Sequence, residues 1–258
     1  MEDLRDAQND LSGKTVRNMF SALHSFYQWL RKRKIISLQE MPEFPDTSQY
    51  VMGYRNLISK DQQLAVLDEV YRLSYKINPK IWLGIKFLST YFSIRPGEMI
   101  RLKEKQINLM VGRFIIPDPK EKKYKSVPIL AEDIELLKQF PRGLPDLPFF
   151  RHVKGISGTR EGKPFGEKYF YKWWKRACSN LGIQEVDLYG GTKHSTVTAL
   201  ENNGWLYDEI KTASGISTNE AFDRYFRTSG KKTRDIYHDA VPGRKIGKQL
   251  GNNFEGPK

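Results

Sequence analysis

The chain has 258 residues, 39% of them hydrophobic, which is enough apolar material for one large domain and a small one. The formal net charge of +13 predicts a polyanionic partner, most simply nucleic acid, although a generally basic protein would carry the same charge. The single cysteine, Cys178, excludes an internal disulfide and is expected to be a buried free thiol. The sequence shows no long apolar run and no signal peptide, so we expect a cytoplasmic protein without a membrane span.

An amphipathic helix is predicted over residues 12–33. Apolar side chains recur at helical spacing from Val16 to Leu30, Ser12 is a candidate N-cap, and the basic run at 31–34 suits the C-terminus of a helix. Because a lone helix cannot bury its own apolar stripe, this helix is expected to need helical partners.

Prolines and a glycine without a clear period predict a linker over residues 36–57. The chain is therefore expected to comprise a partial helical domain at 1–35, this linker, a larger domain at 58–240 and a flexible C-terminal tail at 241–258.

The larger domain is predicted to be mainly α-helical with a small antiparallel β-sheet. Ser59 and Gln62 form a capping box before a helix whose apolar residues are Leu64, Leu67 and Val70. Two short β-like runs around a turn predict a hairpin. The further predicted elements are a helix from Asn78-Pro79 to about Ser93, a short helix from Pro96 to Leu102, strands at 113–116 and 124–129, and helices near 131–140, 166–181, 192–202 and 217–228.

Two segments offer cations for a phosphodiester chemistry that uses no metal. Such a reaction requires a nucleophile, cations on the non-bridging oxygens and an acid for the leaving oxygen. Arg95 is followed three residues later by Glu98, so an arginine fork that can grip a phosphate has a carboxylate to orient it, although a surface ion pair has the same spacing. The hairpin tip carries Lys120, Lys122 and Lys123, which can enter a groove beside phosphates or form a solvated turn.

Two later segments offer an acid–base group and a nucleophile. Residues 187–195 contain Lys193 and His194, and residues 216–226 contain Tyr225. Taken singly, a histidine is more often a hydrogen-bonded core or rim residue, and a tyrosine in a helix is more often part of its apolar face. The order of all four segments therefore carries more information than any one of them.

In this order the four segments resemble the active-site boxes of the tyrosine recombinases of the phage-integrase family. The resemblance spans roughly residues 59–228, with a weaker similarity of residues 12–33 to the family's core-binding domain. It implies a mainly α-helical catalytic domain with a small antiparallel sheet, preceded by a part of the helical core-binding domain.

The resemblance also implies the roles of individual residues. Tyr225 would attack the scissile phosphate and form a 3′-phosphotyrosyl bond, while Arg95 and Lys193 would neutralise the developing charge. Lys120 would protonate the leaving 5′ oxygen, with its two lysine neighbours in the hairpin as competitors, and His194 would support it. Glu98 would orient Arg95, the arginine of the family's first box, and no cofactor or metal is required.

Double-stranded DNA is the partner that the resemblance implies, bound by a tetramer that acts on two duplexes, with no membrane involved. Basic residues of the helix, the hairpin and the last segment are the expected DNA contacts. These residues are Lys14, Arg17, Arg31, Lys32, Lys122, Lys123 and Arg224.

Three positions depart from the family's pattern. Gly190 stands where the family has a histidine, Lys193 where it has an arginine, and Ile216 where it has a histidine or tryptophan. Lysine offers a point charge without the two-donor fork of arginine. In another register Phe222 takes the place of the nucleophile, although the order Arg-Tyr favours Tyr225. Three interpretations stay open: an active recombinase, a degenerate recombinase fold that binds DNA without cutting it, and a basic helical adaptor.

Overall fold

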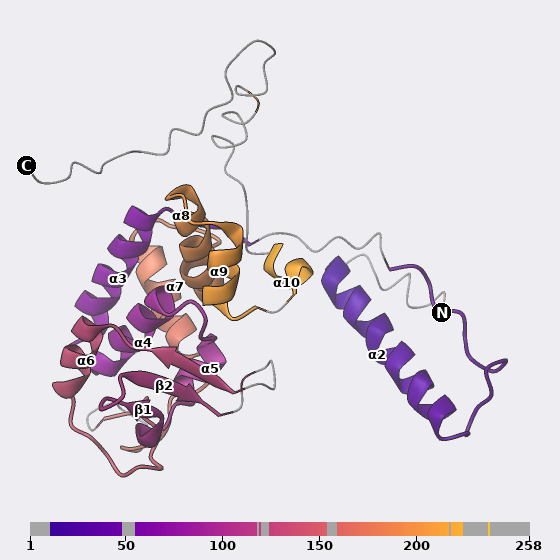
Figure 1. Cartoon of the computed structure of the whole chain (residues 1–258), viewed down its shortest axis with the longest axis horizontal. Coiled ribbons are helices and arrows are strands. Elements are labelled where there is room, and N and C mark those ends of the chain that lie inside the picture. The colour runs from indigo at the N-terminus through magenta and orange to yellow at the C-terminus, as the bar shows by residue number, and fades with distance from the viewer. Residues whose placement is uncertain are drawn as a thin grey trace, which may run out of the picture. The chain divides into compact units, whose positions relative to one another are not determined.

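The computed structural model describes residues 11–47, 55–117, 119, 124–153, 159–216, 218–223 and 237, without the side chains of 220 and 221. The chain divides into two compact units, Met1–Tyr54 and Arg55–Lys258 (Figure 1). Each unit is described by itself. Within the described ranges, every helix is too short or too polar to cross a membrane.

The first unit contains the helix α2 (Gly13–Lys32), which confirms the predicted helix. Ser12 caps it, because the Ser12 hydroxyl accepts a hydrogen bond from the backbone N–H of Thr15 at 3.3 Å. Val16 and Phe20 are its buried residues. Four large apolar side chains of the helix are exposed, namely Met19, Leu23, Phe26 and Trp29, and Tyr27 and Leu30 are half-buried.

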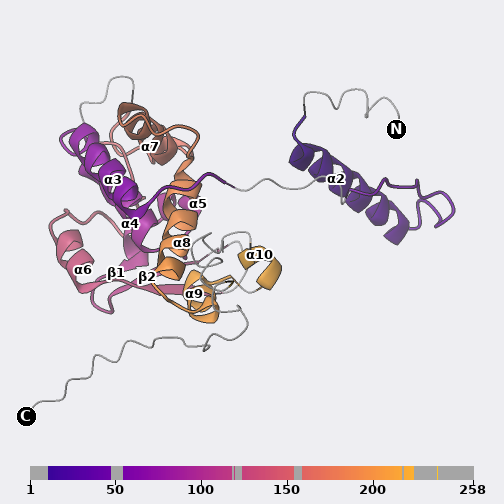
Figure 2. The same cartoon turned by 90° about the horizontal axis from the view of Figure 1, so that it is seen from above.

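Three helices form the centre of the second unit: α3 (Lys60–Ser74), α4 (Pro79–Thr90) and α7 (Tyr169–Asn180). The Ser59 hydroxyl accepts from the backbone N–H of Gln62, whose side chain accepts from the backbone of Ser59, so the predicted capping box is confirmed. Both α4 and α7 pack against α3, and Figure 2 shows α7 beside α3.

The buried face of α3 includes a polar residue. Gln63, Val66 and Val70 are completely buried, whereas Leu64, one of the apolar residues of the sequence pattern, is 49% exposed. Gln63 occupies the inward position next to Leu64. Apolar periodicity cannot identify a buried glutamine.

A three-stranded antiparallel sheet flanks these helices. Its strands are β1 (Ile107–Asn108), β2 (Arg113–Ile116) and β3 (Lys125–Pro128), in the order β1-β2-β3. Phe114 pairs with Val127 in the predicted hairpin, which is confirmed. The two residues of β1 are too few for an alternating pattern, and this strand was not predicted.

The remaining elements complete a mainly helical unit, as predicted. Predicted helices occur near 131–140 and 192–202, although the second begins with a π-helical turn; the helix α9 was not predicted. These elements are α5 (Pro96–Ile100), the 3-10 helix η2 (Glu104–Gln106), α6 (Ala131–Lys138), the π-helical turn η3 (Gly190–His194), α8 (Ser195–Asn202), α9 (Tyr207–Ser214) and α10 (Asn219–Asp223).

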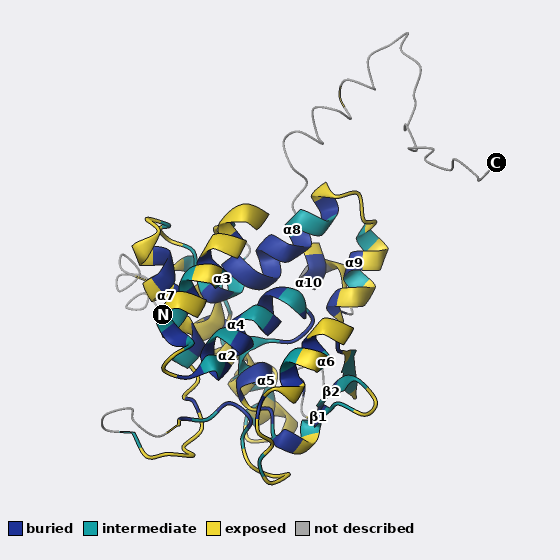
Figure 3. Ribbon diagram, turned by 90° about the vertical axis from the view of Figure 1, so that its left-hand side faces the viewer, coloured by how far each residue is buried: buried dark blue, intermediate teal, exposed yellow. Residues whose placement is uncertain are grey.

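Two apolar clusters hold the second unit together. The larger cluster contains the completely buried Trp174, Phe87 and Phe114 and joins the three central helices to the sheet. Figure 3 shows the buried inner faces of the helices and their exposed outer faces. The smaller cluster joins α8, α9 and α10 and consists of the buried residues Val197, Ile210, Ile216 and Phe222, with Phe92, Leu200 and Tyr207 packed against them.

Candidate active site

The first candidate segment forms a charged network at the start of α5. The Arg95 guanidinium donates to Glu98 Oε1 at 3.1 Å, and the Arg95 backbone N–H donates to Glu98 Oε2 at 3.0 Å. Glu98 therefore fixes both the backbone and the side chain of Arg95. The Glu98 side chain is 3% exposed and that of Arg95 is 22% exposed, so the arginine can still reach a phosphate.

Lys125, at the start of β3, joins the hairpin to this network. Its ammonium donates to Glu98 Oε2 at 2.7 Å and to the backbone carbonyl of Ser93 at 2.5 Å. Glu98 is thus shared between two cations in a largely buried place, where the loss of one partner is costly. The tip lysines Lys120, Lys122 and Lys123 lie outside the described residues.

The segment 187–195, which corresponds to the second box of the family's pattern, includes the π-helical turn η3. Lys193 is 2% exposed and His194 is 7% exposed, so both predicted site residues are buried. The His194 ring meets the Tyr189 ring edge to face at 5.3 Å between centroids. A lysine as buried as Lys193 requires polar partners to stay charged.

The first residues of the second unit contact this turn and the residues beside it. We call residues 55–58 the entry segment. The backbone N–H of Ile58 donates to the Ser195 hydroxyl at 3.0 Å, and this hydroxyl donates to the Gly190 carbonyl at 2.8 Å. Arg55 forms an ion pair with Asp187, whose other carboxylate oxygen accepts from the Gly190 backbone N–H at 2.6 Å.

Gly190 is in close contact with the entry segment. A Cβ atom at Gly190 would lie 2.7 Å from the carbonyl oxygen of Asn56 and 3.2 Å from the carboxylate of Asp187. The side chain of Asn56 also donates to the Glu185 carbonyl at 3.1 Å, which holds Asn56 in place. The position at which the resemblance expects a histidine therefore has no room for a side chain in this arrangement.

The last candidate segment is described only in part. Ile216 and Phe222 are buried in the smaller apolar cluster. The Tyr207 hydroxyl donates to the Asp223 carboxylate at 2.6 Å and ties α10 to α9, and this bond raises the pKa of Tyr207 to about 12. The predicted nucleophile Tyr225 and its neighbour Arg224 lie outside the described residues.

The described contacts connect the first segment with the hairpin and with the fourth segment. Lys125 joins the hairpin to the first box through Glu98. Phe92, three residues before Arg95, packs with Val197 of the helix after the second box and with the buried residues of the fourth segment. Arg95 is the most exposed of the three catalytic candidates that the structure describes.

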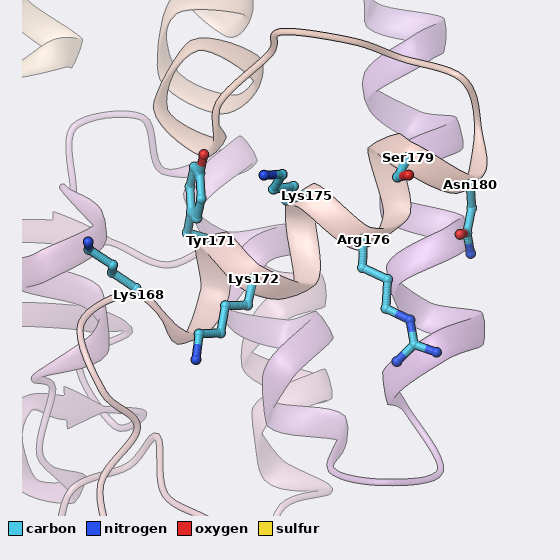
Figure 4. A pocket seen from close by; sticks show the side chains of 7 residues that line it. All are labelled: Lys168, Tyr171, Lys172, Lys175, Arg176, Ser179 and Asn180. Carbon is cyan, nitrogen blue, oxygen red and sulfur yellow. The ribbon is translucent and has the colours of Figure 1, made fainter.

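The outer face of α7 is a basic groove that the sequence interpretation missed. It has a volume of about 520 Å³ and is lined by Lys168, Tyr171, Lys172, Lys175, Arg176, Ser179 and Asn180. Figure 4 shows these side chains along one helix and the loop before it. The spacing of the cations by three and four residues is visible in the sequence and could have indicated this face.

Four predicted DNA contacts lie on the helix of the first unit. Lys14, Arg17, Arg31 and Lys32 are all exposed on α2. This placement leaves them accessible to a polyanion within that unit.

Cys178 is the buried free thiol that was predicted. Burial raises its pKa to about 11, so very little thiolate is present at neutral pH. Among the residues that the structure describes, histidine, cysteine and carboxylate side chains do not gather in groups of three that could hold a metal.

Comparison of structures finds proteins of the same architecture, whereas comparison of the sequence finds no match. No protein-family model matches the sequence, and no curated protein matches it. The XerH site-specific recombinase bound to a palindromic difH substrate has a TM-score of 0.66 at 18% identity, covering 90% of this chain and 66% of that one.

Two further structures agree with this comparison. The Tn1549 transposon integrase in complex with transposon right end DNA has a TM-score of 0.63 at 15% identity, covering 92% of this chain and 82% of that one. The XerA recombinase has a TM-score of 0.53 at 17% identity, covering 91% and 79%. All three are tyrosine recombinases, and this chain therefore has the tyrosine-recombinase fold.

Proposed function

We propose that this chain binds double-stranded DNA and cuts and rejoins its strands through a covalent bond between Tyr225 and a 3′ phosphate. The observation that carries the proposal is the network in which Glu98 holds both Arg95 and Lys125. An arginine fixed by a buried carboxylate, yet partly exposed, is suited to bind a phosphate in one orientation.

The proposed reaction needs no cofactor. The Tyr225 phenol releases its proton to water and its oxygen attacks the phosphorus, the bond to the 5′ oxygen breaks, and that oxygen leaves with a proton from Lys120. Arg95 and Lys193 neutralise the charge that develops on the phosphate, and His194 supports the proton transfer. Attack by a 5′ hydroxyl on the phosphotyrosyl bond reverses these steps and releases Tyr225.

The basic groove on α7 and the exposed cations of α2 are proposed to contact DNA phosphates. Together they account for part of the net charge of +13. Assembly into a tetramer on two duplexes follows from the family resemblance and belongs to the same proposal.

A second candidate function is DNA binding without cleavage. Two observations favour it. The position of the family histidine is closed by the contact between Gly190 and Asn56, and Ile216 is a buried apolar residue where the family has an imidazole or indole. An active site without these two groups would lose donors for the transition state, each worth about a hundredfold or more in rate.

Trapping a covalent adduct on a nicked duplex separates the two candidates. The parent chain is expected to form the adduct, and Tyr225→Phe is expected to abolish it while DNA affinity stays nearly unchanged. Tyr237→Phe is the control, because Tyr237 is 69% exposed and near the same end of the chain. An adduct that survives in Tyr225→Phe refutes the assignment of the nucleophile. A parent that binds DNA but forms no adduct supports binding without cleavage.

A further inference from the structure

A completely buried glutamine lies behind the turn that carries the second-box residues. Gln63 of α3 is 0% exposed. Its side-chain Nε2 donates to the Gly191 carbonyl at 2.7 Å and lies 3.3 Å from the Thr192 carbonyl. These are the two carbonyl groups that immediately precede Lys193. A third acceptor, the Thr196 hydroxyl, lies 3.2 Å from the same nitrogen.

The orientation of this amide is fixed at its other end. The Lys60 ammonium donates to Gln63 Oε1 at 2.8 Å. Since an ammonium can only donate, the amide oxygen must face Lys60 and the amide nitrogen must face the turn. The two N–H groups of Gln63 are thereby directed at the backbone of η3.

The π-helical geometry of η3 changes the hydrogen-bond partners of the Gly191 carbonyl. In an α-helix the backbone N–H of Ser195 would donate to the carbonyl of Gly191. Here it donates instead to the carbonyls of Gly190 and Thr192. Gly191 loses its regular partner, and the side chain of Gln63 supplies a hydrogen bond from a neighbouring helix. Buried carbonyl groups require such partners, and π-helical turns are frequent at functional sites.

We propose that Gln63 is a positioning residue for strand cleavage, because it holds η3 in the π-helical form that presents Lys193 and His194. The part of this inference that concerns strand cleavage rests on the proposed function, whereas the part that concerns the structure of η3 does not. Gln63 acts on the two site residues through the backbone that precedes them, and not through contact with DNA. An ordinary buried glutamine would instead contribute to stability alone.

Two variants test the role. Gln63→Glu keeps the shape and gives Lys60 a charged partner, but it turns an acceptor towards the carbonyls of η3. Gln63→Met keeps the length and removes the donors. Both should lower the rate of adduct formation on a nicked duplex about tenfold to a hundredfold, because small displacements of charged groups have such effects. The dissociation constant for DNA should change less than twofold.

Ser74→Ala is the matched control. Ser74 is on the same helix, is 0% exposed, and donates to the Val70 carbonyl at 2.7 Å, within α3 itself. This variant should lose stability but retain the parental rate of adduct formation. If Gln63→Met and Gln63→Glu form the adduct at the parental rate, the inference is wrong.

Hydrogen exchange of the segment 189–197 keeps the inference testable if the parent forms no adduct. That outcome refutes the cleavage proposal but leaves the question of η3 open to measurement. Faster amide exchange in this segment in both Gln63 variants, and not in Ser74→Ala, supports the positioning role. Parental exchange in the segment overturns it. If Gln63→Met does not fold, Gln63→Glu decides by the same two measurements.

Discussion

A methyl group at position 190 would meet the backbone of the entry segment. In Gly190→Ala the new Cβ would lie 2.7 Å from the Asn56 carbonyl oxygen, so the backbone must move about 0.7 Å to restore an ordinary 3.4 Å contact. Helix propensity alone would favour alanine by about 1 kcal/mol. Overpacking against a fixed backbone costs about 1–3 kcal/mol. The hydrogen bonds of Asn56 and Ile58 resist the movement, so the cost should exceed the gain.

The expected result is a net loss of up to about 2 kcal/mol in the free energy of unfolding, which lowers Tm by up to about 8 °C in a domain of this size. Thermal unfolding followed by circular dichroism measures it. Gly166→Ala is the control, because no atom lies within 4 Å of its Cβ position. Gly190→His should be less stable still and should form less adduct than the parent. A Gly190→Ala variant as stable as Gly166→Ala, or a gain of cleavage in Gly190→His, would refute the reasoning.

Three further predictions concern the network around Glu98, the basic groove and the thiol. Lys125→Met should reduce adduct formation about tenfold or more, because the carboxylate that orients the first-box arginine loses one of its two cations; single-turnover cleavage measures this. Replacing Lys172 and Lys175 by glutamine should weaken DNA binding and flatten the slope of log Kd against log salt by about 0.9 for each phosphate that is no longer neutralised. The control is Lys138→Gln, which should leave the slope unchanged because Lys138 forms an exposed ion pair and does not line the groove. Cys178 should resist alkylation at about pH 8 in the folded protein and react fully after denaturation, because its raised pKa leaves the thiolate scarce until the pH approaches 11; rapid labelling of the native protein, detected by mass, would contradict this.

The predictable parts of the fold are those that local chemistry determines. The cap at Ser12 and the capping box at Ser59 satisfy backbone groups within a few residues, so the sequence predicts both helices. The hairpin follows from two β-like runs around a polar turn. In contrast, α9 was missed although Leu206, Tyr207, Ile210 and Ala213 recur at helical spacing, because with only eight residues the pattern covers about two turns.

The order of the candidate segments could be predicted from the sequence, but the residues that hold the candidate site in place could not. Motif spacing identifies Arg95 and Glu98, and the structure joins them directly. Lys125 was passed over in favour of the lysines at the hairpin tip, because only the fold shows that the start of β3 reaches Glu98. Gln63 is 128 residues from its acceptor Gly191, and contacts over that separation leave no trace in a single sequence.

The entry segment decides where the second unit can be separated from the first. Arg55 and Asn56 contact Asp187, Glu185 and the position of Gly190, so they are part of the scaffold behind the second box although the sequence places them in a linker. A fragment that starts at residue 58 would retain every proposed catalytic residue and still lack this backing. A fragment that starts at residue 55 keeps it, and any protein engineer who fuses another DNA-binding module to this unit should make the junction before that residue.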